Sequence, residues 1–343
     1  MTSDSRHPGD EQIILAHGGG GELTQRLLAE HVFPKLGNAL LDPMTDSAVI
    51  NVPAGRVCMT TDAFVVQPLE FPGGTIGDLA VCGTVNDLAV MGATPKVLSL
   101  AMVLEEGLPL ATLDRVIDSI AASATEAGVV VATGDTKVVE RGRGDGMTIT
   151  TAGVGVLPDG VDMSPARASE GDAIIVTGQI ADHGLAIMSV REGLAFASEL
   201  ISDVAPLNGL VVAVLATGAD VKFMRDPTRC GVAGLLADLS EASGLSIDID
   251  EDTIPISATA RHAAELLGID PLTVANEGKA VIVVPAEQAD VVLAACRAHP
   301  LGERAAVIGQ LTGATPPLVE LITRAGGRRI VQRPYGEELP RIC

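Results

Sequence analysis

Apolar and polar residues follow two different periods along the chain, and together they predict a mixed α/β protein. Residues 22–32 and 110–128 repeat apolar side chains every three or four positions, which is the period of an amphipathic helix. Residues 96–104 and 147–157 are short runs rich in apolar and β-branched residues, as is typical of strands. Strands and helices that alternate in this way indicate sheets covered by helices.

The other predicted elements fall into two blocks that meet near Pro158. The first block holds strands at 48–52, 57–64 and 129–135, a turn at 53–55, and a helix at 76–92. The second block holds strands at 172–178, 279–285 and 305–311 and helices at 183–193, 207–218, 231–243 and 288–299. Residues 328–343 include Pro334 and Pro340 and show no helical pattern.

A chain of 343 residues is long enough for two domains. We predict a segment with a glycine-rich loop at 1–40, an N-terminal domain at 41–157, a C-terminal α/β domain at 158–322 and a mobile tail at 323–343. Apolar residues make up 47% of the chain and aromatic residues only 2%, so Ala, Val, Leu and Ile must build the cores.

Charge and cysteine content narrow the possible partners. The formal net charge of −21 argues against nucleic acid and against an anionic membrane surface, although Mg²⁺ can still carry the phosphates of a nucleotide. Residues 1–12 are polar and no apolar run reaches membrane-spanning length, so we expect neither a signal peptide nor a membrane partner. The five cysteines form no CxxC pair, which favours free thiols in the cytoplasm.

A glycine run is the first candidate for ligand binding. His17 and the glycines at 18–21 follow an apolar stretch and precede a predicted helix. Glycines let backbone N–H groups approach a phosphate, and a helix N-terminus favours an anion. The run matches neither the Walker nor the dinucleotide-binding fingerprint, and a flexible hinge explains the same residues equally well.

Carboxylates at the ends of strands and turns are the second candidate. Each one taken alone is best explained as a cap or turn residue, but as a set they suit Mg²⁺, which prefers carboxylates together with substrate phosphates. The candidate metal ligands are Asp46, Asp62, Asp87, Asp135 and Asp226.

Two further motifs contain groups that could move a proton. In TGDTKVVE, Lys137 could contact phosphate or act as a base, although an exposed Lys137–Glu140 pair on an edge strand is as good an explanation. In NEGK, Glu277 is either a turn residue or a carboxylate that handles protons.

Taken in order, HGGGG, TTDAFVVQPLEFPGG, GTVNDLAVMGATP, ATGDTKVV, RDPTR, NEG and a terminal PRIC resemble the HypE family of hydrogenase maturation proteins. The middle motifs are shared with aminoimidazole ribonucleotide synthetase and selenophosphate synthetase. The resemblance implies a PurM-like two-domain fold, an N-terminal domain that binds ATP and forms a β-barrel across a homodimer, a C-terminal α/β sandwich and a flexible tail.

The resemblance also implies a reaction. Cys343 would receive a carbamoyl group from a HypF-type carbamoyltransferase, and ATP with Mg²⁺ would drive dehydration to a thiocyanate. The cyano group would pass to iron held by a HypC–HypD complex, for nickel–iron hydrogenases. Implied catalytic residues are Cys343, Lys137 and Glu277; implied cofactor-binding residues are His17, Gly18, Gly19, Gly20, Gly21, Asn86 and Thr136.

The residue chemistry suits this reaction. An amide oxygen leaves poorly unless it is phosphorylated, and phosphoryl transfer depends on positioning and on cations. Protons must also leave nitrogen, for which Glu277 or Lys137 would serve. The alternatives are a synthetase that acts on a free small molecule and a carrier that only moves a group. Three residues depart from the family pattern, Ser47, Thr75 and Cys230, and at Cys230 relatives often have Gly.

Overall fold

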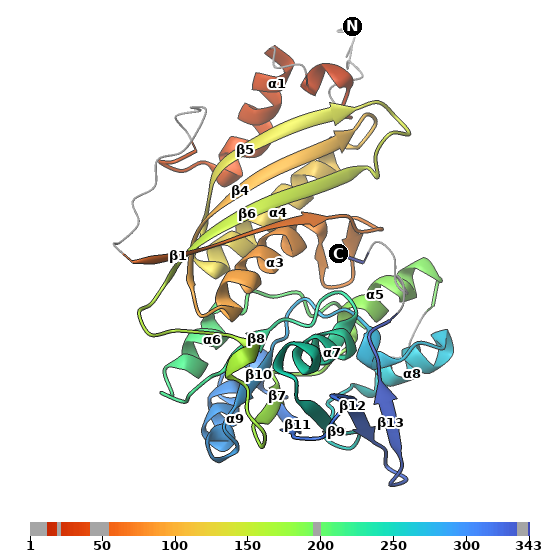
Figure 1. Cartoon of the computed structure of the whole chain (residues 1–343). Helices are drawn as coiled ribbons and strands as arrows, with labels where there is room; N and C mark the ends of the chain where they lie inside the picture. The colour runs from red at the N-terminus through yellow and green to blue at the C-terminus, as the bar shows by residue number, and fades with distance from the viewer. Residues whose placement is uncertain (1–11, 19–21, 42–54, 195–199, 335–341) are drawn as a thin grey trace, which may run out of the picture.

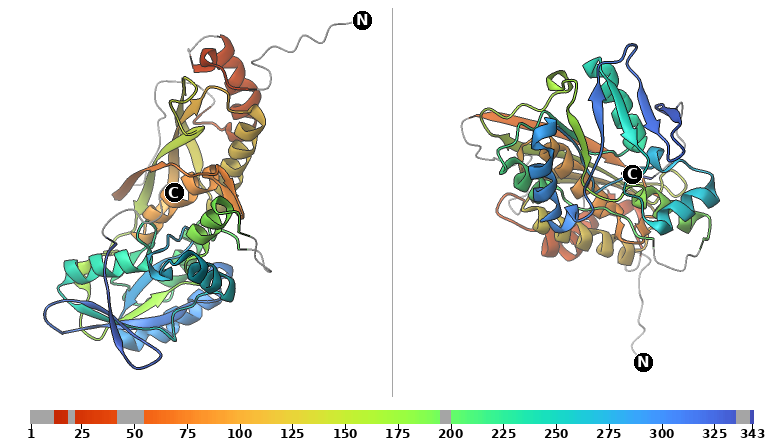
Figure 2. Two further views of the ribbon diagram at one scale, coloured as in Figure 1. Left: turned by 90° about the vertical axis from the view of Figure 1, so that its right-hand side faces the viewer. Right: turned by 90° about the horizontal axis from the view of Figure 1, so that it is seen from below.

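The computed structural model describes residues 12–18, 22–41, 55–194, 200–334 and 342–343. Two α/β domains stack on one another, and the C-terminus of the chain lies between them (Figures 1 and 2). The predicted mixed α/β architecture with two domains is therefore present. The predicted strand at 48–52 lies outside the described residues.

The N-terminal domain is built on a four-stranded sheet with the order β1-β6-β4-β5. β4 and β5 are parallel, and the other two pairs are antiparallel. β1 and β5 are therefore the two edges of the sheet. The strands are β1 (Arg56–Phe64), β4 (Thr94–Glu105), β5 (Val130–Val139) and β6 (Met147–Leu157).

Two long helices, α3 (Ile76–Val90) and α4 (Leu110–Ala127), cover one face of this sheet (Figure 1). α4 buries Leu113, Val116, Ile117 and Ile120 at helical spacing and keeps polar residues outside. It stops at Gly128, whose φ of 68° suits a residue without a Cβ atom. α3 is buried on nearly all sides, because it contacts the sheet, α4 and the C-terminal domain.

Short elements precede and connect these layers. The first of them packs against β5, so the start of the described chain lies at that edge of the sheet. These elements are η2 (Leu15–Gly18), α1 (Glu22–Leu27), η3 (Leu28–Val32), α2 (Phe33–Leu36), β2 (Glu70–Phe71) and β3 (Gly74–Thr75).

The C-terminal domain is built on a seven-stranded sheet with the order β13-β12-β9-β11-β7-β10-β8. Only β9 and β12 pair in parallel within it. Its strands are β7 (Ala173–Val176), β8 (Phe223–Arg225), β9 (Ser246–Asp250), β10 (Val281–Val284), β11 (Ala306–Thr312), β12 (Val319–Ile322) and β13 (Arg328–Val331).

Helices cover both faces of this sheet, so the domain is a sandwich. Ile174 and Val176 point to the face covered by α7, while Ala173 and Ile175 point to the face covered by α6 and α9. This follows from the two-residue period of a strand that is buried on both sides. The helices are α5 (Asp182–Arg191), α6 (Asn208–Leu215), α7 (Gly231–Ser243), α8 (Ala258–Leu267) and α9 (Ala289–Arg297), with the short turns η4 (Pro165–Arg167), η5 (Pro271–Thr273), η6 (Ala286–Gln288) and η7 (Pro300–Gly302).

In the C-terminal domain, five strands and α-helices were not predicted: β8, β9, α8, β12 and β13. β8 is three residues long, and β13 carries two exposed arginines, so neither has a strong apolar signal. β13 also begins within the segment predicted as a tail, because it pairs with β12 at the edge of the C-terminal sheet. None of the helices described here is both long and apolar enough to cross a membrane.

Candidate active site

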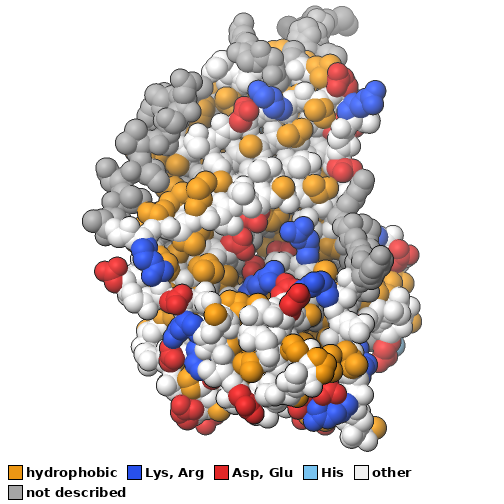
Figure 3. Space-filling view, viewed as in Figure 1, with side chains coloured by type: hydrophobic (Ala, Val, Ile, Leu, Met, Phe, Trp, Pro, Cys, Tyr) orange, Lys and Arg blue, Asp and Glu red, His pale blue; other side chains and the backbone are white. Residues whose placement is uncertain are grey.

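A cavity of about 230 Å³ lies between the two domains, and the last residue of the chain lines it. Acidic and basic side chains gather in the hollow between the domains (Figure 3). We call it the Cys343 cavity. Its lining includes Asp62 and Phe64 of β1, Asp87 of α3, Asp226, Thr228, Arg229, Glu277 and Cys343.

Two aspartates reach the cavity from the N-terminal domain. Alternation along β1 turns Asp62 toward α3, where the Thr84 hydroxyl donates a hydrogen bond to its carboxylate at 2.9 Å. Asp87 lies one turn further along α3, and the Thr60 hydroxyl of β1 donates to it at 2.7 Å. Strand alternation in β1 and the helical turn from Thr84 to Asp87 in α3 therefore bring the two carboxylates to the same side of β1.

Two carboxylates reach the cavity from the C-terminal domain. Asp226 directly follows β8, and Glu277 lies in the turn before β10. The Asp203 carboxylate accepts the backbone N–H groups of Glu277 at 3.1 Å and Gly278 at 3.3 Å, and Lys279 binds it at 3.0 Å. A buried ion pair thus holds the turn that carries Glu277.

The carboxylates raise the pKa values of one another. Burial, followed by the charge of Asp87, raises the pKa of Asp226 to about 7 and raises that of Asp62 as well. Burial, with the charges of Asp226 and Asp203, holds the pKa of Glu277 well above its usual range. The Oε1 atom of Glu277 is buried and has no hydrogen-bond partner among the described residues. An orphaned buried oxygen calls for a ligand.

The end of the chain is anchored in this cavity. Ile342 is only 3% exposed and packs in the core of the N-terminal domain. The backbone N–H of Val65 donates to the main-chain carboxylate oxygen of Cys343 at 3.3 Å. The Cys343 thiol lies in the same cavity as the Glu277 carboxyl, and burial together with the Glu277 charge raises the thiol pKa well above its usual range. Cys343 therefore rests as a protonated thiol beside Glu277.

The TGDTK residues do not reach this cavity within one chain. Asp135, Thr136 and Lys137 lie on β5, which is separated from β1 by β6 and β4. Three strand spacings amount to roughly 14 Å. The Lys137 and Asp135 side chains are 65% and 63% exposed and lie 3.6 Å apart.

The described part of the glycine run lies at the same remote edge as β5. η2, which holds His17 and Gly18, packs beside β5. The Nδ1 atom of His17 accepts the backbone N–H of Ile14 at 3.1 Å, and burial is the main cause that lowers the His17 pKa. Gly19, Gly20, Gly21, Asp46 and Ser47 lie outside the described residues.

Asn86 lies in the domain interface, and its amide is engaged there. It donates to the carbonyl oxygens of Ala205 and Glu277, both at 3.1 Å, and accepts the N–H of Leu207 at 2.7 Å. At 1% exposure it fastens the Glu277 turn to α3. This geometry gives Asn86 a supporting place behind the cavity.

The sequence reasoning did not single out Arg229. Its side chain is exposed, lines the Cys343 cavity and forms no ion pair with any residue in the described part of the chain. The RDPTR motif contained the signal, since a cation beside carboxylates suits phosphate. The next residue, Cys230, has a φ of 64° at the start of α7, a left-handed conformation that glycine adopts without strain.

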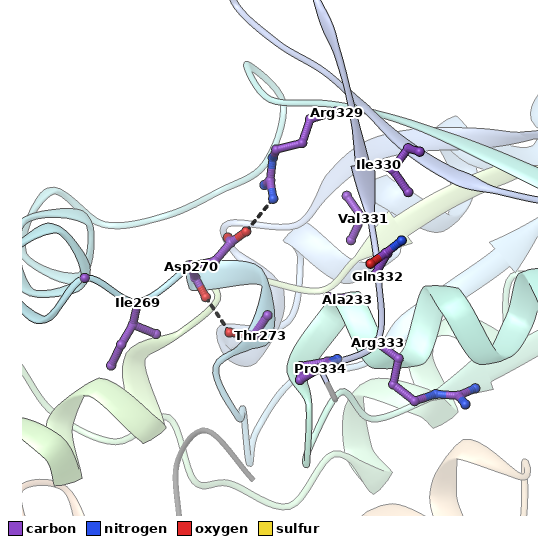
Figure 4. A pocket seen from close by; sticks show the side chains of 11 residues that line it. Ala233, Ile269, Asp270, Thr273, Arg329, Ile330, Val331, Gln332, Arg333 and Pro334 are labelled. Atoms are coloured by element: carbon purple, nitrogen blue, oxygen red, sulfur yellow. Dashed lines mark hydrogen bonds and ion pairs between the residues drawn. The ribbon is translucent and has the colours of Figure 1, made fainter. Parts of the chain in front are cut away.

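A second hollow, of about 710 Å³, lies where the tail leaves β13 (Figure 4). We call it the tail-root hollow, lined by residues of α7, of the chain from Gly268 to Thr273 and of Arg329–Pro334. Arg329 pairs with Asp270 at 2.7 Å, and Arg333 pairs with Asp238 and Glu241 of α7. Its charges are balanced by one another, so the chemistry favours the smaller cavity.

Within the described ranges, no group of three or more His, Cys, Asp or Glu side chains is arranged to hold a metal ion alone. Mg²⁺ commonly uses one or two carboxylates and takes its other ligands from water and phosphate. The mutual repulsion of Asp62, Asp87 and Asp226 would be relieved by such a cation. These residues therefore fit a metal that arrives with a phosphate ligand.

Comparison with known proteins first gives the class. Residues 44–157 match the N-terminal domain, and residues 169–317 the C-terminal domain, of AIR synthase related proteins. This is a family of two-domain α/β proteins, in agreement with the fold.

The particular family follows from full-length relatives. The chain is 50% identical to the carbamoyl dehydratase HypE of Rhizobium leguminosarum bv. viciae, over 97% of this chain and 95% of the relative. A solved structure of HypE in complex with ATP has 40% identity and a TM-score of 0.93, covering 96% and 99% of the two chains. A HypE–HypF complex structure has 43% identity and a TM-score of 0.79, covering 92% and 100%. The chain belongs to the HypE family of carbamoyl dehydratases, and the predictions of this family, of its fold and of an enzyme of this class are confirmed.

Proposed function

We propose that this protein dehydrates a carbamoyl group carried on its own Cys343 thiol, giving a thiocyanate in an ATP-dependent reaction that supplies cyanide ligands for nickel–iron hydrogenases. The single observation that carries this proposal is the position of Cys343 inside the carboxylate cavity, beside Glu277. A terminal cysteine that served only as a carrier would gain nothing from such a setting.

Glu277 is the base of this proposal. A group on the sulfur of Cys343 lies next to the Glu277 carboxyl, within reach of the amide protons that must leave. A carboxylate whose pKa is raised by burial accepts a proton more readily than an exposed one. The Asp203–Lys279 pair holds the Glu277 backbone, so the carboxyl stays aimed at the sulfur.

The other side chains of the cavity suit Mg²⁺ and ATP. Asp62, Asp87 and Asp226 would hold the cation, and Arg229 would meet phosphate oxygens. When bound, ATP supplies the phosphoryl group that turns the amide oxygen into a leaving group. The likeness to a HypE solved with ATP supports the choice of nucleotide.

A homodimer would unite the two separated parts of the predicted site. One edge of the sheet carries the carboxylate cavity, and the other carries η2 and the TGDTK residues. The face away from α3 and α4 exposes apolar side chains, including Val57 and Met59 on β1 and Val130 on β5. Two such sheets closed into a barrel would cover this face and bring Lys137 of a second copy toward the Cys343 cavity.

Partners follow from the same chemistry. The likeness to a HypE–HypF complex supports a HypF-type carbamoyltransferase as the donor of the carbamoyl group. An iron-carrying HypC–HypD complex would receive the cyano group. The five free cysteines suit a reducing cytoplasm.

The test is the intact mass of the protein after incubation with the HypF partner, carbamoyl phosphate and ATP, beside a Cys343→Ala control. We expect a gain of one carbamoyl group at Cys343, followed by loss of one water only when ATP is present. ATP-dependent turnover of a free small molecule that survives in the Ala control would instead favour a synthetase with a free substrate. A carbamoyl group that never loses water would leave only a carrier.

A further inference from the structure

A completely buried histidine holds the end of the chain. His183 lies in the first turn of α5, and its Nε2 atom is 3.0 Å from the carbonyl oxygen of Ile342. Its Nδ1 atom is 2.8 Å from the hydroxyl of Ser202. Its ring and the ring of Phe71 form a T-shaped contact, with their centroids 5.6 Å apart. The imidazole is thus fixed on three sides.

The groups around the ring settle which nitrogen of His183 carries the proton, because the carbonyl oxygen of Ile342 beside Nε2 can only accept a hydrogen bond. The backbone N–H of Val204 donates to the Ser202 hydroxyl oxygen at 3.1 Å. The hydroxyl proton is then free to point at Nδ1, which accepts it. Burial lowers the pKa of His183, so the ring is neutral and its single proton lies on Nε2. Nε2 therefore donates to the carbonyl oxygen of Ile342.

His183 thus binds the main chain one residue before the cysteine that carries the thiol. The Ile342 side chain is buried in the core of the N-terminal domain, and the Val65 N–H donates to a main-chain carboxylate oxygen of Cys343. Depth and direction of the last residue are thus set by two main-chain hydrogen bonds and one apolar side chain. None of the three involves the sulfur, so they can persist while the sulfur is modified.

The segment that orients His183 also orients Glu277. Ser202 binds the imidazole, and the adjacent Asp203 accepts the N–H groups of Glu277 and Gly278. The Ser202 backbone N–H is itself anchored to the carbonyl oxygen of Pro72 in the N-terminal domain, at 2.8 Å. Residues 202 and 203 therefore place the tail and the base relative to one another.

We propose that His183 is the positioning residue that docks the C-terminal tail, with Ser202 selecting its tautomer, so that the Cys343 sulfur is presented to Glu277. The docking itself is a property of the folded chain. Its consequence for dehydration rests on the function proposed above.

The docking is tested by the rate at which iodoacetamide alkylates Cys343, followed by peptide mass in the full-length protein. His183→Leu keeps the bulk of the side chain and removes the donor, which leaves the Ile342 carbonyl oxygen unsatisfied. We expect alkylation of Cys343 about tenfold faster than in the wild type. His183→Gln, whose amide can replace the Nε2–H donor, should restore most of the protection. Ser202→Ala keeps the imidazole but removes the hydroxyl that donates to Nδ1, so either ring nitrogen can carry the proton. Its alkylation rate at Cys343 should lie between those of the two His183 variants.

Cys58 on β1 is the internal control, since it lies away from His183 and should react at one rate in all four proteins. A global loss of structure would instead speed Cys58 and the buried Cys82 as well, and would count against a local docking role. Equal rates at Cys343 in the wild type and His183→Leu would overturn the proposal. So would a failure of His183→Gln to protect better than His183→Leu.

Single-turnover dehydration of the carbamoylated variants separates this proposal from the function on which it builds. We expect His183→Leu to slow the step about tenfold with an unchanged KM for ATP, because His183 does not line the Cys343 cavity, where the nucleotide is proposed to bind. If no protein dehydrates its tail but the alkylation order holds, docking stands and the proposed function fails. If all variants dehydrate equally and alkylate equally, the function stands and the docking role fails.

Discussion

The Cys343 cavity and the tail-root hollow hold similar charged residues in opposite arrangements. In the tail-root hollow each arginine has a carboxylate partner, as in the Arg329–Asp270 pair, and these side chains are largely exposed. In the smaller cavity four carboxylates lie close together, and one oxygen of Glu277 has no hydrogen-bond partner in the part of the chain that the structure describes. The charges of the larger hollow are thus paired with one another, whereas the carboxylates of the smaller cavity lack enough cations to balance them.

The difference shows where binding energy is available. Exposed pairs that are already satisfied have little to gain from a ligand. Buried carboxylates that repel one another are stabilised when they bind a cation or a proton, because burial has removed the water that would otherwise stabilise their charges. Volume alone would have selected the wrong hollow, whereas the state of the charges selects the one that holds the terminal thiol.

The test with the largest expected effect removes one carboxylate from each hollow and compares the rates of dehydration. Glu277→Gln should lower the single-turnover rate of dehydration about 10²–10⁴-fold, because it removes the base without changing shape. Glu241→Gln, at the exposed tail-root pair, is the matched control and should leave the rate unchanged. The measurement is rapid-quench mass analysis of the carbamoylated protein with ATP. A Glu277→Gln rate close to that of the wild type would move the base elsewhere, with Lys137 of a second copy as the next candidate.

A second test compares the ion pairs of the two regions. Asp203→Asn leaves the Lys279 charge buried and unpaired and should lower the free energy of unfolding by about 3–5 kcal/mol. Arg329→Gln breaks an exposed pair and should cost about 0–1 kcal/mol. Urea denaturation measures both. The double variant Asp203→Asn with Lys279→Met should regain most of the loss, and its failure to do so would assign the effect to the backbone hydrogen bonds of the Glu277 turn.

The smallest expected effect is a pH dependence confined to the carboxylate cavity. The pKa of Asp226 is raised to about 7, so below that pH the carboxyl is protonated and neutral and must lose its proton to hold a cation. The apparent affinity for Mg²⁺ should therefore rise about tenfold per pH unit up to pH 7 and level off above it. Calorimetric titration with a non-hydrolysable ATP analogue measures this. Asp226→Asn should bind weakly with a flatter profile, and an unchanged profile would place the cation elsewhere.

The sequence anticipated the residues of the cavity better than it anticipated their neighbours. Asp62, Asp87, Asp226, Glu277 and Cys343 were candidates, and the structure brings these five together. The sequence could single them out because each carboxylate lies in or next to a strand, a turn or a helix with a clear pattern. Their roles remain part of the proposal.

Other parts of the site depended on contacts that no local pattern encodes. Asn86 was a candidate for cofactor binding, but its amide forms hydrogen bonds with backbone groups 119 to 191 residues away in the chain. His183 was not among the candidates, since the carbonyl that it binds lies 159 residues further on. Such partners become visible only when the domains are packed together.

The amino-acid sequence alone was enough to predict the two-domain α/β class and the family, and to single out the terminal thiol as a candidate, because these follow from residue types and from periods read over a few positions. The packing of the domains was needed to show three things: Ile342 and Cys343 lie between the domains, Glu277 has an oxygen with no partner among the described residues, and Lys137 lies at the far edge of the sheet. The physical reason is that burial, strand order and hydrogen-bond pairing depend on the distances between segments. Those distances are set by how the two domains pack, and no local spacing along the chain reports them.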